Sequence, residues 1–222
     1  MDAAAHREFK DRLFEQFARV GKALSSPRRL EIVDLLAQGE RTVEEIAGET
    51  TIPVANASQH LQVLKGARMV ESRRDGLYAF YRLAGEEVFE VWRAVRGLGE
   101  SCLAEIDWVV ETYLKDRDAL EVVGAIALME RLSDGSVVVL DVRPEEEYRA
   151  GHIPGALSVP VDALEAALQT LPKDREIVAY CRGPYCVFSD EAVKLLEARG
   201  YRARRLMEGF PEWRAAGLPV ES

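Results

Sequence analysis

The residues best suited to chemistry are two cysteines, Cys181 and Cys186, at the two ends of a short loop. A short apolar run, Ile177–Tyr180, predicts a buried strand that delivers Cys181 at its carboxyl end, and a helical pattern begins near Val187. A thiol in this position faces backbone N–H groups and the positive end of a helix, and both stabilise thiolate over thiol. We therefore predict that the pKa of Cys181 falls well below the value of about 8.5 for free cysteine, and that Cys181 is a nucleophile.

The same N–H groups can hold an outer sulfur atom that bears negative charge, and Arg182 adds a cation nearby. Three cysteines are too few for a disulfide scaffold. No apolar run follows the first residues as in a signal peptide, and the longest apolar stretch, Val122–Met129, is too short to span a membrane. We therefore expect a cytoplasmic protein whose cysteines work as thiols.

A second set of polar residues lies on a predicted helix from Pro53 to Lys65. Ala57, Leu61 and Leu64 have the spacing of a buried helical face, which leaves amide and hydroxyl groups on the outer side. Such groups can make paired hydrogen bonds to base edges in the major groove of DNA. The candidate DNA-binding residues of this helix are Ala55, Asn56, Ser58, Gln59 and Gln62. A surface helix that only solubilises the protein is the alternative interpretation.

A predicted hairpin favours the DNA-binding interpretation. Two segments, Met69–Arg74 and Leu77–Leu83, flank the strong turn dipeptide Asp75-Gly76. Near this turn lie Arg73 and Arg74, whose guanidinium groups can clamp DNA phosphates beside a helix that contacts bases. The net charge of −9 gives no bulk reason to expect nucleic-acid binding, so this function depends on the local basic surface.

The elements before the hairpin complete a helix-turn-helix pattern. A first amphipathic helix spans roughly Glu8–Leu24, and Ser26-Pro27 ends it and begins a second helix. Thr42 and Glu45 form a capping box that opens a short third helix before the polar one. Two short helices joined by a tight turn are typical of a DNA-binding module.

Residues 10–112 resemble the ArsR/SmtB family of winged-helix repressors, through Ser26–Leu30, Ser58–Leu64 and the Asp75-Gly76 turn. The resemblance implies a homodimer that binds a partly palindromic operator in double-stranded DNA. It places His60 in the recognition-helix motif, where we expect a mainly structural role. Many members sense metals, but the histidines and cysteines of this chain lack the spacing of a metal site. We therefore expect no bound metal and no cofactor.

A predicted long helix from residue 85 indicates a dimer independently of the resemblance. Its residues alternate at spacings of four and three over about 26 positions, as in a heptad seam. The seam consists of Val88, Trp92, Val95, Gly99, Cys102, Ile106, Val109 and Tyr113. We expect it to pair with a second copy, with the first helix beside it. Cys102 is interpreted mainly as a small buried hydrophobe, with a redox or effector role as the alternative.

From about residue 117, short β-rich runs alternate with helical stretches, which is typical of a parallel α/β sheet. The runs are Val137–Val142, Leu157–Val161, Glu176–Cys181 and Ala203–Leu206. The charged run Lys115–Asp118 suits a solvated linker. We therefore predict a mainly α winged helix-turn-helix domain over residues 1–115 and an α/β domain with a parallel sheet over residues 116–222.

The second domain resembles the rhodanese family of sulfurtransferases over roughly residues 120–220. The matching motifs are Leu140–Arg143, Glu147-Tyr148, Gly151–Ala156, the Cys181 loop and Gly209–Trp213. The resemblance implies that Cys181 accepts a sulfane sulfur as a persulfide. It implies that the pocket is formed by Arg182, Gly183, Pro184, Tyr185 and Cys186, that Asp141, Arg143 and Glu147 brace the loop, and that His152 is structural.

Two positions depart from related families. Many rhodaneses hold a basic residue where this chain has Cys186, so we expect weak turnover of thiosulfate. Cysteine phosphatases and arsenate reductases need an arginine where this chain has Val187, which disfavours their chemistry. Cys186 is instead a second thiol that can resolve a loaded or oxidised Cys181 into a disulfide.

Together these patterns predict a dimeric, DNA-binding transcriptional regulator, a repressor by its resemblance, whose rhodanese domain senses or transfers reactive sulfur through Cys181. The expected small-molecule partner is a polysulfide, a persulfide or thiosulfate. One alternative is a sulfurtransferase enzyme whose winged helix mainly dimerises the chain. Another is a thiol-based repressor that responds to arsenic or to redox state.

Overall fold

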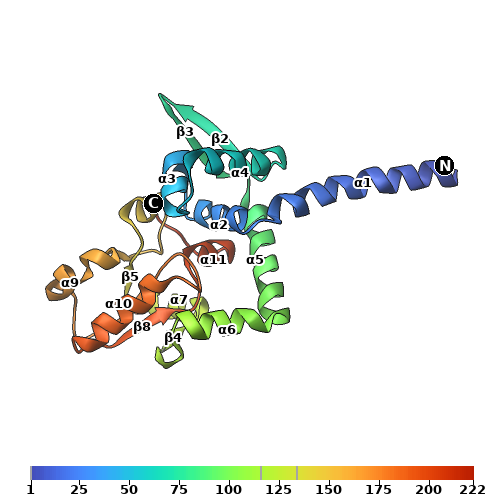
Figure 1. Cartoon of the computed structure of the whole chain (residues 1–222). Coiled ribbons are helices and arrows are strands. Elements are labelled where there is room, and N and C mark those ends of the chain that lie inside the picture. The colour runs from blue at the N-terminus through green and yellow to red at the C-terminus, as the bar shows by residue number, and fades with distance from the viewer. Residues whose placement is uncertain (1, 116, 134) are drawn as a thin grey trace. The chain divides into compact units, whose positions relative to one another are not determined.

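The computed structural model describes residues 2–115, 117–133 and 135–222 (Figure 1). Backbone contacts divide the chain into two compact units, Met1–Ala94 and Val95–Ser222. The division falls inside a helix, α5 (Glu86–Cys102), upstream of residues 115–116. The domain boundary there stays a prediction, and each unit is described by itself.

The first unit is helical with a small antiparallel sheet. Its elements are α1 (Ala3–Leu24), α2 (Pro27–Leu36), β1 (Arg41–Thr42), α3 (Val43–Glu49), α4 (Val54–Gly66), β2 (Val70–Asp75), β3 (Tyr78–Leu83) and the start of α5. The strands pair in the order β1-β3-β2. A core that includes the fully buried Ile32, Ile46, Leu61 and Leu64 holds α2, α3 and α4 together. This is a winged helix-turn-helix, as predicted.

Local signals explain where these elements begin and turn. Thr42 accepts a hydrogen bond from the Glu45 backbone N–H at 3.2 Å, and the Glu45 carboxylate accepts one from the Thr42 N–H at 2.7 Å. This reciprocal capping confirms the predicted start of α3. In the hairpin, Asp75 pairs with Tyr78, so the connecting loop is Gly76-Leu77. Gly76 has a φ of +58°, which a glycine adopts without strain.

The second unit contains a five-stranded sheet between helices. Its elements are α6 (Ala104–Tyr113), β4 (Val122–Val123), α7 (Ala125–Ser133), β5 (Val137–Asp141), α8 (Glu145–Ala150), β6 (Leu157–Ser158), α9 (Leu164–Ala167), β7 (Glu176–Tyr180), α10 (Val187–Ala198), β8 (Ala203–Leu206) and α11 (Phe210–Ala215), with 3-10 turns at Arg117–Ala119, Val161–Ala163 and Leu168–Thr170. All strand pairs are parallel, in the order β4-β8-β7-β5-β6. This confirms the predicted α/β fold.

Side chains of the two central strands alternate between two cores. Leu140 of β5 and Ala179 of β7 face the core that α9 and α10 cover. Val139 and Val178 face the opposite core, which includes residues of α7 and α11. Both faces of the sheet are therefore buried, which explains the continuous apolar runs seen in the sequence. Asp141 and Tyr180 pair at the carboxyl ends of β5 and β7. Cys181 is the residue that directly follows β7.

The predicted continuous helix from residue 85 to Tyr113 is wrong. Leu103 takes an extended conformation (φ −118°, ψ 95°) and separates α5 from α6. A Cβ placed on Gly99 would lie 3.1 Å from the Cδ1 of Ile106, so the missing side chain lets α6 fold back closely on the end of α5. Figure 1 shows the resulting turn between the two helices.

The heptad seam is interrupted as well. Val88 and Trp92 pack against the core of their own unit, and the Trp92 indole N–H donates to the Asp34 carboxylate at 2.7 Å. The residues with exposed apolar surface are further along, among them Val95, Val109 and Tyr113. A single uniform self-pairing stripe is therefore not present along this stretch of the described chain.

The prediction of a solvated linker is wrong at Arg117. This side chain is buried, and its Nε lies 3.0 Å from a carboxylate oxygen of Asp190 on α10. Asp116, which belongs to the same predicted linker, lies outside the described residues. Burial raises the pKa of Asp190, although the charges of Arg117 and Arg205 oppose that rise.

The buried pair of Asp141 and Arg143 generates the first prediction. Both side chains are 0% exposed, and Arg143 donates to both carboxylate oxygens of Asp141. Asp141→Asn leaves the arginine charge buried without its counter-ion, so we expect the free energy of unfolding to fall by about 3–5 kcal/mol. Urea unfolding of the full chain, followed by circular dichroism, measures this loss.

The matched control is Glu145→Gln on α8, which removes the exposed ion pair of Glu145 with Arg149. We expect a change of less than about 1 kcal/mol there, because exposed pairs are weak. Equal unfolding midpoints for Asp141→Asn and Glu145→Gln would contradict the assigned importance of the buried pair.

Candidate functional site

Cys181 follows β7 directly and is 2% exposed. Both of its neighbours in the chain are held by buried carboxylates. The Tyr180 hydroxyl donates to Asp141 at 2.5 Å, and the Arg182 guanidinium lies 2.6 Å from a Glu147 oxygen. The backbone at Cys181 is therefore fixed from both sides.

A buried network extends this support. Arg143 donates to the Gly151 carbonyl at 2.8 Å as well as to Asp141. The Tyr180 hydroxyl accepts a hydrogen bond from the Ile153 N–H at 3.1 Å. Burial, and then the charge of Asp141, raise the pKa of Tyr180, so its phenol stays a protonated donor. These contacts agree with the bracing role expected for Asp141, Arg143 and Glu147.

The loop after Cys181 closes on itself before α10 begins. The Cys186 N–H donates to the Gly183 carbonyl at 3.1 Å, and Cys186 is the residue that precedes the first turn of α10. The structure joins Cys181 and Cys186 in a disulfide, with their Cα atoms 6.2 Å apart. The N–H groups in the first turn of α10 have no partners within the helix. The positive end of the α10 dipole therefore lies directly after Cys186 in the chain. That Cys181 is a low-pKa nucleophile stays a prediction.

Arg182 is placed differently from the simple expectation of a cation beside the thiol. Its guanidinium pairs with Glu147, whose side chain is 0% exposed. The positive charge of Arg182 is therefore balanced by a buried negative charge, and the side chain braces the loop. Gly183 and Pro184 are partly buried and Tyr185 is exposed, so the five predicted loop residues share one short segment between Cys181 and α10.

Three residues that support the loop were not predicted individually from the sequence: Gly209, Glu212 and Arg96. A Cβ on Gly209 would lie 2.3 Å from the Gly183 nitrogen, so the two backbones touch where no side chain fits. The Glu212 carboxylate accepts a hydrogen bond from the Gly209 N–H at 3.0 Å and pairs with Arg96 at 2.8 Å. The closing motif Gly209–Trp213 was the available signal for the first two; nothing local pointed to Arg96.

His152 and Cys102 lie in settings that differ from the loop. The His152 ring stacks on Tyr148 at 3.7 Å, and its Nδ1 lies 2.9 Å from the Tyr148 carbonyl oxygen. This agrees with a structural role. Cys102 is an exposed free cysteine at the end of α5, so its interpretation as a buried hydrophobe is wrong. Its redox or effector role stays a prediction.

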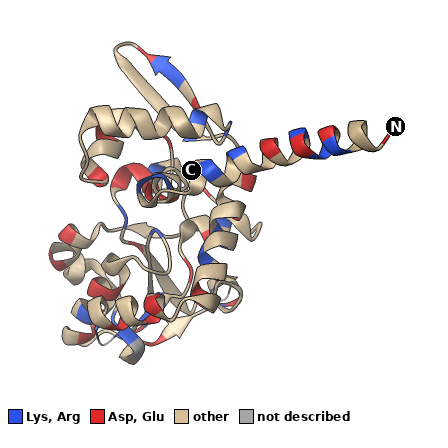
Figure 2. Cartoon of the chain, turned by 45° about the vertical axis from the view of Figure 1, so that its right-hand side comes forward, with Lys and Arg blue, Asp and Glu red and all other residues tan. Residues whose placement is uncertain are grey.

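The candidate DNA interface is formed by α4 and the hairpin. Ala57, Leu61 and Leu64 are fully buried, as predicted. The outer residues Ala55, Asn56, Gln59 and Gln62 are exposed, while Ser58 and His60 are partly buried. Figure 2 shows α4 with little charge beside a hairpin that carries basic residues.

The two arginines of the hairpin differ in their partners. Arg73 pairs with Glu40 at 2.5 Å and with Asp75 at 3.3 Å. Arg74 is exposed and forms no ion pair with another described residue. Its charge is thus the more available of the two for a DNA phosphate.

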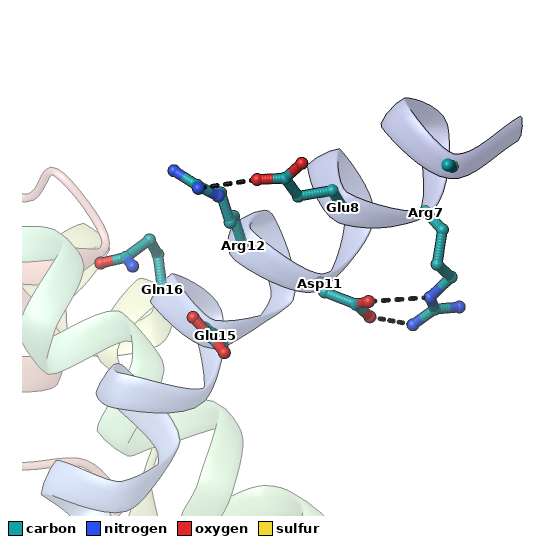
Figure 3. A pocket seen from close by; sticks show the side chains of 7 residues that line it. Arg7, Glu8, Asp11, Arg12, Glu15 and Gln16 are labelled. Atoms are coloured by element: carbon teal, nitrogen blue, oxygen red, sulfur yellow. Dashed lines mark hydrogen bonds and ion pairs between the residues drawn. The ribbon is translucent and has the colours of Figure 1, made fainter. Parts of the chain in front are cut away.

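The first helix, α1, has one charged and one apolar face. Figure 3 shows the charged face, where Arg7 pairs with Asp11 and Arg12 pairs with Glu8 at 2.7 Å. On the apolar side, Phe9, Phe14 and Phe17 are 53%, 64% and 60% exposed. Phe14 and Phe17 are in edge-to-face contact, with ring centroids 5.9 Å apart, so at least two of these exposed rings share one apolar patch.

The described residues contain no group of three or more His, Cys, Asp or Glu side chains arranged to hold a metal ion. In the same part of the chain, no helix combines the length and the apolar character needed to cross a membrane.

The fold and these sites define a winged-helix DNA-binding regulator with an α/β domain of the rhodanese type. Residues 26–72 match the family described as "Bacterial regulatory protein, arsR family", and residues 125–216 match "Rhodanese-like domain". Over 98% of its length the chain is 44% identical to the HTH-type transcriptional regulator Rv0324 of Mycobacterium tuberculosis, covering 96% of that protein. The chain belongs to the arsR family of transcriptional regulators and carries a rhodanese domain.

Two further relatives match one part of the chain each. A sulfurtransferase of Allochromatium vinosum is 35% identical over 42% of this chain and 88% of its own length. A solution structure from Mycobacterium bovis is 49% identical, covers 42% of this chain and 87% of its own, and has a TM-score of 0.40. It is described as the homodimeric winged helix-turn-helix DNA-binding domain of a possible ArsR-family regulator.

The contact at Gly209 generates the second prediction. In Gly209→Ala the new methyl group meets the backbone of Arg182 and Gly183, at 2.5 Å and closer, so the Cys181 loop has to move. We expect at least a tenfold slower reaction of Cys181 with iodoacetamide in the reduced protein, measured by peptide mass spectrometry.

The control is Gly124→Ala, because a Cβ on Gly124 meets no atom within 4 Å. Its Cys181 should react at the wild-type rate. A Gly209→Ala protein that also reacts at that rate would show that the close approach does not position the loop.

Proposed function

We propose that this regulator senses reactive sulfane sulfur, and that loading of Cys181 changes its affinity for operator DNA. The observation that carries the proposal is the Cys181 loop itself. It combines a nucleophile whose neighbours are fixed by Asp141 and Glu147 with a second thiol, Cys186, at bonding distance. The rhodanese and arsR-family matches in one chain support the pairing of sulfur chemistry with DNA binding.

The first chemical step is the uptake of sulfur by Cys181. Its thiolate attacks the outer sulfur of an organic persulfide, RS–SH. A new S–S bond forms, the old S–S bond breaks, and RS⁻ leaves with the electron pair. Cys181 then carries a persulfide, and the N–H groups before α10 can stabilise the charge of the outer sulfur.

The second step uses Cys186. Its thiolate attacks the inner sulfur of the Cys181 persulfide, forms the disulfide and expels HS⁻. The sulfane sulfur is reduced to hydrosulfide while the two cysteines are oxidised. Two equivalents of a small thiol would then restore both free cysteines. The bonded arrangement of Cys181 and Cys186 is the product expected for this step.

The charges near the loop favour persulfides and polysulfides over thiosulfate as donors. The basic residue that would grip a dianion is replaced by Cys186. The nearby guanidinium of Arg182 is already paired with the buried Glu147. The proposed donor is therefore a small persulfide or polysulfide rather than thiosulfate.

On the DNA side, the exposed amides of α4 would contact base edges and Arg74 would contact a phosphate. The apolar face of α1, with Phe9, Phe14 and Phe17, would be covered by a second copy of the chain. A homodimer places two α4 helices on one duplex, which fits a partly palindromic operator.

The third prediction tests this proposal on the reduced full-length protein. A duplex selected from random DNA by that protein serves as the probe, and glutathione persulfide serves as the donor. We expect Cys181 to gain the mass of one sulfur or to bond to Cys186, and the operator Kd to change by about fivefold or more. Peptide mass spectrometry and fluorescence anisotropy provide the two readouts.

Three variants control the experiment. Cys181→Ser should bind the duplex with an unchanged Kd in the presence of donor, whereas Cys102→Ser should respond like the wild type. Arg74→Ala should bind more weakly before and after treatment, with a smaller dependence on salt, because it loses a phosphate contact. Equal wild-type Kd values with and without complete Cys181 loading would refute the sensor, and steady thiosulfate turnover without duplex binding would favour an enzyme.

A further inference from the structure

The helix α5 belongs to both compact units. Its first turns pack against the winged-helix core through Val88 and Trp92, and the Trp92 indole N–H donates to Asp34 of α2 at 2.7 Å. From Val95 onward the same helix belongs to the second unit. α5 is one continuous α-helix of 17 residues, so a ladder of backbone hydrogen bonds joins its two ends.

Within the second unit, two side chains of α5 hold the Cys181 loop and its support. Glu100 accepts a hydrogen bond from the Tyr185 hydroxyl at 2.7 Å, and Tyr185 lies between the two loop cysteines. Arg96 pairs with Glu212 at 2.8 Å, and their side chains are only 14% and 8% exposed. The loop therefore contacts α5 directly through Tyr185, and Glu212 supports it indirectly through Gly209.

Tyr185 is a persistent donor in this contact. Partial desolvation of the phenol, followed by the hydrogen bond to Glu100, raises the pKa of Tyr185 to about 12, so the phenol is protonated at neutral pH. Trp92, Arg96 and Glu100 are spaced four residues apart and share one face of α5. One helix face thus carries both the anchor in the winged-helix core and the contacts of the sulfur loop.

We propose that α5 transmits the state of the Cys181 loop to the DNA-binding unit through the Tyr185–Glu100 hydrogen bond, with Arg96–Glu212 as its second support. This inference rests on the proposed sulfur-sensing function. Bonding Cys181 to Cys186 fixes the ends of the loop that carries Tyr185, and opening the bond or adding a sulfur changes that spacing. Tyr185 then either pulls on Glu100 or releases it, and α5 shifts against Asp34 through Trp92.

The test follows Trp92 directly, in full-length protein labelled with 5-fluorotryptophan. The three tryptophan signals in the fluorine NMR spectrum are assigned by Trp→Phe variants. We expect the Trp92 signal to shift when diamide, a thiol oxidant, bonds Cys181 to Cys186. In Tyr185→Phe and in Glu100→Ala this shift should be lost, although mass spectrometry shows the same disulfide. Tyr113→Phe, an exposed tyrosine on α6, should behave like the wild type.

The operator Kd is measured on the same proteins, before and after treatment with glutathione persulfide. The ratio of the two values, about fivefold in the wild type, should fall below twofold in Tyr185→Phe while Cys181 still loads. A Trp92 signal that does not shift in oxidised wild type, or a Tyr185→Phe protein with the full wild-type shift and Kd ratio, would overturn the role of α5. A Trp92 shift with an unchanged wild-type Kd would instead overturn the sensor function and leave the mechanical link standing.

Discussion

The structure around Cys181 depends on two buried carboxylates that hold the residues on either side of it. Asp141 fixes Tyr180 and Arg143, and Glu147 fixes Arg182. Removing charged groups from water is costly unless they are paired and hydrogen-bonded. Both carboxylates have such partners here, and these contacts hold the backbone on either side of Cys181 in one conformation. If Cys181 is the predicted nucleophile, it needs no catalytic base beside it, because backbone groups and the start of α10 can stabilise its anion.

In the proposed sensor, this arrangement would let a loop of few residues act as a chemical switch. The walls of the loop are fixed by the ionic network and by the close approach of Gly209 to Gly183. The part that can change is the relation between Cys181 and Cys186, together with Tyr185 between them. In the proposed mechanism, a chemical change at the two cysteines acts on Tyr185, whose hydroxyl donates to Glu100 of α5. On this proposal, a modest shift of α5 alters the fit of the winged helix to DNA.

Much of this organisation follows from local patterns in the sequence. The capping box of Thr42 and Glu45 and the continuous apolar runs of β5 and β7 each specify an element through nearby residues, and the structure contains them. The hairpin is also present, but Asp75 pairs with Tyr78, so its turn is Gly76-Leu77, one residue later than the predicted Asp75-Gly76. The position of Cys181 at the end of a buried strand follows from the same reasoning. The very short strands β1 and β4 were not predicted, because two residues are too few to show a period.

The remaining features depend on contacts between distant residues. The heptad spacing from Val88 to Tyr113 is regular, yet the helix is interrupted at Leu103, where α6 packs against Gly99. In the sequence, Arg117 lies in a charged run that is typical of a linker. In the structure it pairs with Asp190 of α10, which is distant in the sequence. The contacts of Arg96 and Glu100 join α5 to residues far along the chain, and no local periodicity encodes them.

The central claim is that the fold makes Cys181 an anion at neutral pH, and the rate of its alkylation as a function of pH tests this most directly. The measurement uses the Cys186→Ser, Cys102→Ser double variant, so that Cys181 is the only thiol. Our account predicts a rate profile with a midpoint clearly below about 8.5, the value for free cysteine. A midpoint at or above that value would contradict the account, because the loop would then give the thiol no more anionic character than water does.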